Sequence, residues 1–131
     1  MRKSPISIEN RDPQLWLHTF RFRREEHLKG RKEIKEVFGN GKRYGCKEAK
    51  LFVLRNNLPY NRICFTFSRG KWNAVARNRA KRLGREAFRL MKGCLLGGHD
   101  LLLLVYPGKR ESLSDRTRQL EFLFRKAGLI K

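Results

Sequence analysis

The chain has 131 residues, of which 40% are hydrophobic, and its 32 Lys and Arg against 12 Asp and Glu give a formal net charge of +20. Such an excess of cations indicates nucleic acid first and an anionic membrane second, and it disfavours a solvated surface without a partner, which normally carries both signs. The length predicts one modest core. We expect residues 1–20 to be a mostly mobile extension and residues 21–131 to form the domain.

Neither a membrane span nor export is predicted. The longest apolar run, LLLLVY after Asp100, is far shorter than the roughly 20 residues that cross a bilayer. The N-terminus starts with basic residues, but no apolar segment follows them, so it does not resemble a signal peptide. Three widely spaced cysteines without a C-x-x-C pair are expected to be reduced thiols and not zinc ligands. We therefore expect a cytoplasmic protein that does not bind membranes.

The first predicted element is a helix over residues 29–38. Ile34, Val37 and Phe38 recur in it at helical spacing, which is typical of an amphipathic helix. The sequence GNG at 39–41 is expected to end this helix in the left-handed conformation that Gly and Asn tolerate.

Two strands are predicted next, separated by the turn residues NNLPYN. AKLFVLR (49–55) is apolar on both faces, as expected of a strand that is covered on both sides. RICFTFS (62–68) alternates instead, so its two faces differ. We expect the large residues to pack in the core and the small ones to lie beneath water, another element or a ligand. The large residues are Ile63, Phe65 and Phe67, and the small ones are Cys64, Thr66 and Ser68.

A basic helix over residues 73–92, a strand over 100–106 and a last helix complete the predicted order. The strand is continuously apolar, so we expect it in the middle of the sheet. Ser114 is the predicted N-cap of the last helix and Gly128 lies at its C-terminal end. Because a helix joins the second and third strands, these two should be parallel. The predicted fold class is α/β, a small mixed sheet packed with helices.

The basic helix, NAVARNRAKRLGREAFR and its continuation, is amphipathic on a helical wheel. Val75, Ala80 and Leu83 belong to the apolar stripe, which the sheet should hold. Arg79 falls near the edge of this stripe, close to Glu86, so we expect it to be partly structural. The remaining polar residues share the opposite arc: Arg77, Asn78, Lys81, Arg82, Arg85, Arg89 and Lys92.

Cations in this number on one face match the phosphates of a nucleic-acid backbone. Each neutralised phosphate releases counterions, so affinity should fall steeply with salt. Arg69 and Lys71 extend the surface to the region before the helix N-terminus, which itself favours anions. Nothing in the pattern resembles a base-reading code, and we therefore expect recognition of shape and backbone.

A catalytic centre, a metal site and a small-molecule substrate are not predicted. His18, His27 and His99 are scattered, and no pair of carboxylates has the spacing of a two-metal site. Gly39 and Gly41 match only a fragment of a phosphate-binding loop.

The motif NAVARNRAKRLGREAFR resembles the signature of the bacterial ribonuclease P protein family, an Arg-Asn-Arg helix that follows Asn-Ala-Val. KEIKEVFGNGKRY is similar to the family's first helix and loop, RICFTFSRG to the strand before the motif, and LEFLFRKAGL to the closing helix. Two departures stand out. The family commonly has Ser-Lys-Lys-x-Gly where this chain has SRGKW (68–72), so that Trp72 replaces a glycine. Ile34 stands where the family has an aromatic residue.

The resemblance implies a fold like domain 2 of ribosomal protein S5, with a left-handed crossover between the parallel strands, although right-handed connections are the rule. It also implies the small subunit of a ribonucleoprotein that removes the 5′ leader of precursor tRNA. The RNA subunit would perform the hydrolysis with Mg²⁺, and the protein alone would not cleave. The protein would bind the catalytic RNA and hold the leader in a cleft between its first helix and its sheet.

The resemblance assigns two sets of residues to this work. The RNA-binding set is Arg69, Lys71, Asn73, Arg77, Asn78, Arg79, Lys81, Arg82, Arg85 and Arg89. The leader-binding set is Ile34, Phe38, Phe52, Cys64, Thr66 and Ser68. Phe38 could equally be a buried core residue. The rival functions are a ribosomal or RNA-chaperone protein that uses the same surface on another RNA, and a stand-alone metal-dependent nuclease.

Overall fold

The computed structural model describes residues 22–70, 72–106 and 111–131. The predicted extension, residues 1–20, and the predicted contact Lys71 lie outside the described residues. No helix in the described ranges is long and apolar enough to cross a membrane. The elements are η1 (Arg24–Glu26), α2 (Arg31–Asn40), β1 (Lys42–Gly45), β2 (Ala49–Arg55), β3 (Arg62–Phe67), α3 (Ala74–Met91), η2 (Lys92–Cys94), β4 (His99–Val105) and α4 (Leu113–Lys126).

The strands form one mixed sheet in the order β1-β2-β4-β3. β2 pairs antiparallel with β1 and β4, and β3 pairs parallel with β4, with Ile63 opposite Leu101. The predictions of a central apolar third strand and of a parallel pair are therefore confirmed. β3 lies at the edge of the sheet, where its outer side is open to other segments.

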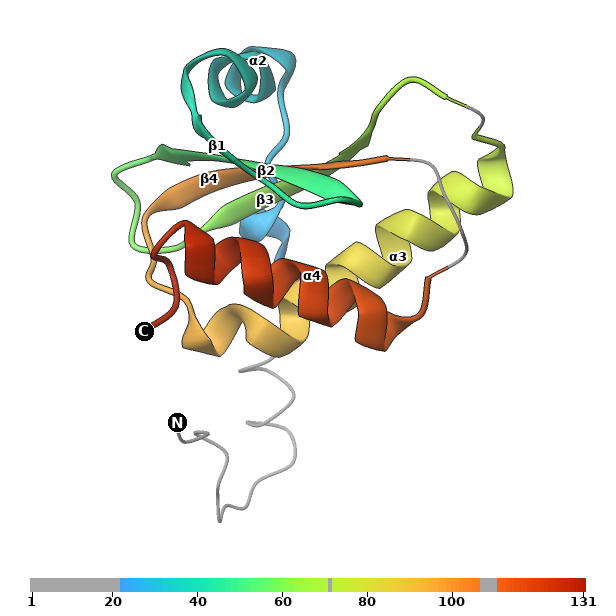
Figure 1. The fold of residues 1–131 in the computed structure, drawn as a ribbon. Helices are drawn as coiled ribbons and strands as arrows, with labels where there is room; N and C mark the ends of the chain where they lie inside the picture. The colour runs from blue at the N-terminus through green and yellow to red at the C-terminus, as the bar shows by residue number, and fades with distance from the viewer. Residues whose placement is uncertain (1–21, 71, 107–110) are drawn as a thin grey trace.

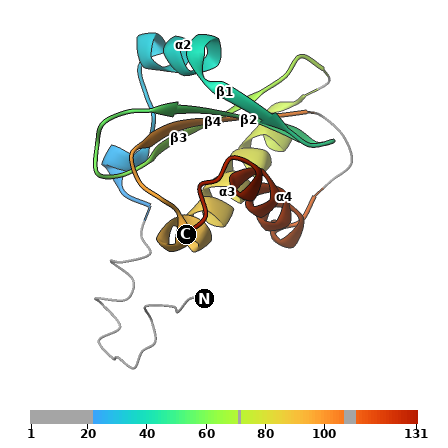
Figure 2. The ribbon, with the colours of Figure 1, turned by 60° about the vertical axis from the view of Figure 1, so that its left-hand side comes forward.

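The two faces of the sheet are covered unequally (Figures 1 and 2). α3 and α4 pack beneath it, and α2 lies above it. The larger core lies on the side of α3 and α4 and contains Ile63, Phe88 and Phe124. The smaller core lies under α2 and contains Val37 and Phe52. β2 contributes to both cores, as its two apolar faces predict.

Three local expectations need correction. β1 was not predicted, because KRYG is short and polar and carries no alternating pattern. α4 begins one half-turn earlier than expected, since Ser112 and not Ser114 caps it in a reciprocal capping box with Asp115. α2 does end at GNG, but Gly41 has φ −74° and is not left-handed. A Cβ there would lie 2.5 Å from the carbonyl oxygen of Val37, so glycine is required by close backbone approach.

Candidate RNA-binding surface

α3 is capped and amphipathic as predicted. The Asn73 side chain accepts a hydrogen bond from the backbone N–H of Ala76 at 2.7 Å, which satisfies a donor that the first turn leaves unpaired. The stripe that faces the core consists of small and apolar residues, among them Ala80, Ala87 and Phe88. The opposite side presents Arg77, Asn78, Lys81, Arg82 and Arg85.

Some cations of α3 are neutralised within the protein. Arg89 Nε donates to Glu86 Oε2 at 3.1 Å, and this hydrogen bond lowers the pKa of Glu86. Lys92 Nζ pairs with Glu26 Oε1 at 2.8 Å, so it holds η1 against α3 and does not share the outward arc as expected. Among the described residues, the cations of this surface without an ion-pair partner are Arg69, Arg77, Lys81, Arg82 and Arg85. We refer to these five as the cationic face.

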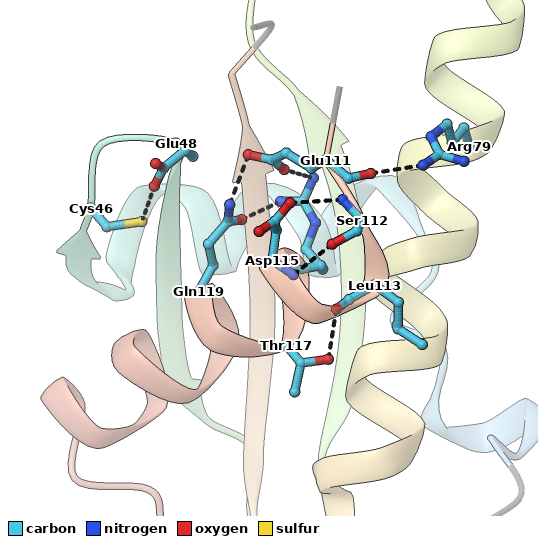
Figure 3. A network of polar contacts seen from close by, with 10 residues as sticks. Cys46, Glu48, Arg79, Glu111, Ser112, Leu113, Asp115, Thr117 and Gln119 are labelled. Atoms are coloured by element: carbon cyan, nitrogen blue, oxygen red, sulfur yellow. Dashed lines mark hydrogen bonds and ion pairs between the residues drawn. The ribbon is translucent and has the colours of Figure 1, made fainter. Parts of the chain in front are cut away.

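Arg79 points away from the cationic face. Its Nη2 donates to the backbone carbonyl oxygen of Glu111 at 2.8 Å, just before α4 (Figure 3). The expected neighbour Glu86 is instead bound by Arg89. Arg79 therefore has a structural contact, but with the start of α4.

The loop between β3 and α3 shows how the SRGKW departure is accommodated. Gly70 has φ +149°, in the region that favours glycine. The Trp72 indole N–H donates to the Ser68 carbonyl at 3.1 Å, and its ring packs against Phe67 with centroids 4.8 Å apart. Trp72 therefore fixes the loop in place of a glycine turn.

A groove of about 500 Å³ lies beside this loop and brings predicted residues of both sets together. Its polar lining joins the end of β3 to the first turns of α3: Thr66, Ser68, Arg69, Arg77 and Lys81. Phosphates that enter the groove would meet three cations of the cationic face. A continuous basic lining of this kind suits single-stranded nucleic acid.

The remaining leader residues lie on the α2 side of the sheet. Phe38 is 50% exposed, with its ring centroid 5.0 Å from that of Phe52. Phe52 itself is 2% exposed, so the expectation that it lines the cleft is corrected: it supports Phe38 from below. Ile34 and Cys64 are partly buried against the same small core. Burial raises the pKa of the Cys64 thiol, and the charge of Lys81 opposes this shift.

Sequence reasoning missed the segment before α2, which attaches to the open edge of β3. The Leu28 N–H donates to the Ile63 carbonyl at 2.9 Å, and the His27 ring stacks on Phe22 with centroids 4.0 Å apart. Burial, followed by the charges of Lys29 and Arg85, lowers the pKa of His27. The segment therefore continues the sheet past β3. Its irregular backbone leaves no periodic signal in the sequence that could have revealed this.

Sequence reasoning also missed a polar network between α3 and α4 (Figure 3). Arg116 is 2% exposed and pairs with the Glu111 carboxylate, Nη2 to Oε1 at 2.7 Å. Gln119 bridges both side chains, accepting from Arg116 Nη1 at 2.8 Å and donating to Glu111 Oε2 at 2.7 Å. A buried arginine in an otherwise solvent-facing pattern cannot be distinguished from a surface arginine by sequence alone. In the described part of the chain, no three His, Cys, Asp or Glu residues are grouped as metal ligands.

Comparisons with known proteins agree with the fold and identify the family. The chain matches the family "Ribonuclease P" over residues 22–128. It is 36% identical to the ribonuclease P protein component of Alkaliphilus metalliredigens over 104 residues, covering 79% of this chain and 94% of that protein. The corresponding protein of Natranaerobius thermophilus is 43% identical over 96 residues, covering 73% of this chain and 83% of that protein.

A solved structure gives the same result. The ribonuclease P protein from Thermotoga maritima superposes with a TM-score of 0.66 at 27% identity, covering 76% of this chain and 96% of that chain. The family match over residues 22–128 includes the sheet, α3 and α4 together, and not the basic helix alone. This chain belongs to the ribonuclease P protein family and is a protein subunit of ribonuclease P, the enzyme of tRNA 5′ processing.

Proposed function

We propose that the cationic face binds the catalytic RNA of ribonuclease P, and that the adjoining groove guides the 5′ leader of precursor tRNA. The observation that carries this proposal is that the five cations have no internal ion-pair partner among the described residues. Unpaired charge at this density is stabilised by an external polyanion. Three of these cations also line one groove.

The leader would leave the groove over the edge strand and reach α2. Thr66 and Ser68 line the groove, and Cys64 continues the same face of β3 toward the small core under α2. Phe38, exposed on α2, offers a ring on which an unpaired base can stack. The leader would therefore contact polar atoms at one end of this path and an aromatic ring at the other.

The chemistry in this proposal belongs to the RNA subunit. That RNA binds the Mg²⁺ ions and performs the hydrolysis, and the protein positions the precursor so that it is favoured over mature tRNA. We place this assembly in the cytoplasm. A positioning subunit raises the rate by holding the reacting groups in the right geometry and not by supplying an acid or a base.

A cleavage assay at low Mg²⁺ tests the proposal. A 5′-extended precursor tRNA is incubated with the full chain alone, a ribonuclease P RNA alone, or both. We expect cleavage at the mature 5′ end only, or far faster, in the mixture. Cleavage by the protein alone would instead establish a stand-alone nuclease. If the mixture is no faster than the RNA alone, the ribosomal or RNA-chaperone function takes precedence.

A further inference from the structure

A second cavity shares Trp72 with the groove as a lining residue. It has a volume of about 330 Å³, within the range of sites that hold small ligands or single bases. The cavity opens between the first turns of α3 and the start of α4, two segments that diverge in Figure 1. Its apolar walls are Trp72, Val75, Ala76, Ala80, Leu83, Val105 and Tyr106. We call this cavity the slot.

The polar side of the slot is built from Arg79, Glu111 and Arg116. The Arg79 guanidinium donates from Nη2 to the Glu111 carbonyl oxygen, and it makes no other hydrogen bond or ion pair among the described residues. Arg116 is almost fully buried, yet its Nε has no hydrogen-bond partner among the described residues. That Nε is shielded from solvent and is out of reach of a ligand in the open slot, so the donors that a ligand can meet there are those of Arg79.

The slot therefore combines two flat aromatic walls, arginine donors and a carboxylate acceptor. A ligand that matches it must be planar, with acceptors on one edge and donors on another. Guanine has both, since O6 and N7 accept from arginine and the N1–H and N2–H₂ groups can donate to a carboxylate. Adenine does not offer two adjacent acceptors to an arginine fork, and cytosine, whose N3 and O2 are adjacent acceptors, has its only donor, N4–H₂, on that same edge.

We propose that the slot receives one unpaired guanine of the bound RNA. The proposal rests on the proposed function, because it is RNA that brings a base to this place. Trp72 lines both the groove and the slot, so a strand whose phosphates lie on Arg77 and Lys81 has a base within reach of the slot. Arg79 then binds RNA through a base, whereas the cationic face binds phosphates.

Guanosine, adenosine and cytidine 5′-monophosphates test the slot, because they share the phosphate and differ in the base. Each is titrated into the ¹⁵N-labelled full chain, and the amide signals are followed by NMR. We expect Ala76 and Ala80, which line the slot, to respond to the guanine nucleotide at about tenfold lower concentration than to the others. Lys81 and Arg82, on the cationic face, should respond to all three alike. If the amide signals of Ala76 and Ala80 respond at the same concentration of all three nucleotides, the proposal is overturned.

Two variants sharpen this test. In Ala76→Phe the new ring fills the slot and leaves every cation in place, so the guanine preference should disappear while the common response of the cationic face remains. Arg79→Lys keeps a donor for the Glu111 carbonyl but removes the fork, so the preference should shrink even if Ala76→Phe does not fold. A preference that survives in folded protein of both variants contradicts the slot.

The cleavage assay keeps this proposal distinct from the proposed function. If the RNA subunit and the protein cleave the precursor together but no guanine preference is found, the slot is wrong and the function stands. If the preference is found but the protein does not accelerate cleavage, the slot stands as a nucleotide site and the proposed function is wrong.

Discussion

Gly84 of α3 lies against the ring of Phe65 in β3. A Cβ at Gly84 would lie 2.6 Å from both Cδ1 and Cε1 of that ring, closer than real Cβ atoms approach. The missing side chain therefore sets the distance between α3 and the sheet. Because Phe65 also lines the groove, this contact holds the cationic face beside β3.

We expect Gly84→Ala to lower the free energy of unfolding by about 1 kcal/mol. Alanine favours a helix by roughly 1 kcal/mol over glycine, but overpacking a core typically costs about 1–3 kcal/mol. Urea denaturation measures the change. Gly39→Ala is the matched control, since Gly39 is also helical and no heavy atom lies within 4 Å of its Cβ position. If both variants are equally stable, the contact with Phe65 does not limit packing.

This contact illustrates which features of the protein are predictable from its sequence. The existence and the burial pattern of α3 follow from local periodicity and from Asn73 as a cap, so the helix was predicted within one residue at each end. The direction of a single side chain depends on which element lies opposite. The wheel therefore placed Arg79 correctly at the edge of the stripe but could not identify Glu111, 32 residues away, as its partner.

Elements that depend on pairing were harder to predict than elements that depend on periodicity. β1 exists because β2 offers it an edge, with Lys42 opposite Val53, and not because KRYG favours a strand. Likewise, Lys92 does not belong to the cationic face because it forms an ion pair with Glu26, which lies in η1. Tertiary contacts thus decided which predicted cations remain available for RNA.

The ion pair between Arg62 and Asp100 is expected to be important for stability. Asp100 accepts from Arg62 Nε at 2.8 Å and from Nη2 at 2.7 Å, and also from Asn56 Nδ2 at 2.8 Å. Asp100→Asn keeps the shape but leaves a partly buried guanidinium without its carboxylate. Because the Arg62 side chain remains partly exposed to solvent, we expect the free energy of unfolding to fall by about 2 kcal/mol, below the range for fully buried pairs.

Thermal and urea denaturation of Asp100→Asn measure this loss. Glu121→Gln provides the comparison, since its pair with Arg125 is exposed and should contribute less than about 1 kcal/mol. Equal effects of the two substitutions would show that burial adds nothing to the Arg62–Asp100 pair.

The free protein should lose stability as the pH falls below about 6.5. Burial is the main cause that lowers the pKa of both His27 and His99, with Lys29 and Arg85 adding to the shift at His27. Because the folded pKa lies below the unfolded one, the unfolded chain takes up protons first. The stability that the two neutral histidines contribute is therefore fully present above their pKa in the unfolded chain. It is lost as the pH decreases toward their lower pKa in the folded protein.

The midpoint of thermal unfolding at pH 7.5, 6.5 and 5.5 measures this effect. It should decrease in the wild type and change less in the double variant His27→Gln, His99→Gln. The lowered pKa of Glu86 acts at lower pH, below its ordinary value of 4.5, and does not contribute in this window. A midpoint that rises toward pH 5.5 contradicts the prediction.

Cations of the cationic face and Arg79 should differ in their salt dependence. Arg77→Ala removes an unpaired cation, so it should weaken binding to the RNA subunit. It should also reduce the slope of log affinity against log salt concentration by the amount that about one phosphate contact contributes. Arg79→Ala should weaken binding with little change in slope, because its guanidinium holds the Glu111 carbonyl and no phosphate. Filter binding at several salt concentrations measures both slopes, and equal slopes for the two variants would place Arg79 on the phosphate backbone.

The exposed ring of Phe38 should distinguish precursor from mature tRNA. Stacking on a base contributes about 1–3 kcal/mol, so Phe38→Ala should weaken binding of the holoenzyme to precursor tRNA by about fivefold or more. Its affinity for mature tRNA, which has no leader, should not change. The ratio of the two dissociation constants is therefore the measurement.

Phe122→Ala is the matched control for this variant. Phe122 is also 50% exposed, but it lies on α4, beyond the sheet from α2. Its removal deletes the same exposed aromatic surface and should leave the ratio unchanged. If Phe38→Ala weakens precursor and mature tRNA alike, the ring acts only through its packing on Phe52, since a loss of support for α2 affects both ligands. A change confined to the precursor requires a contact with the leader itself, because the leader is the only part of the ligand that differs.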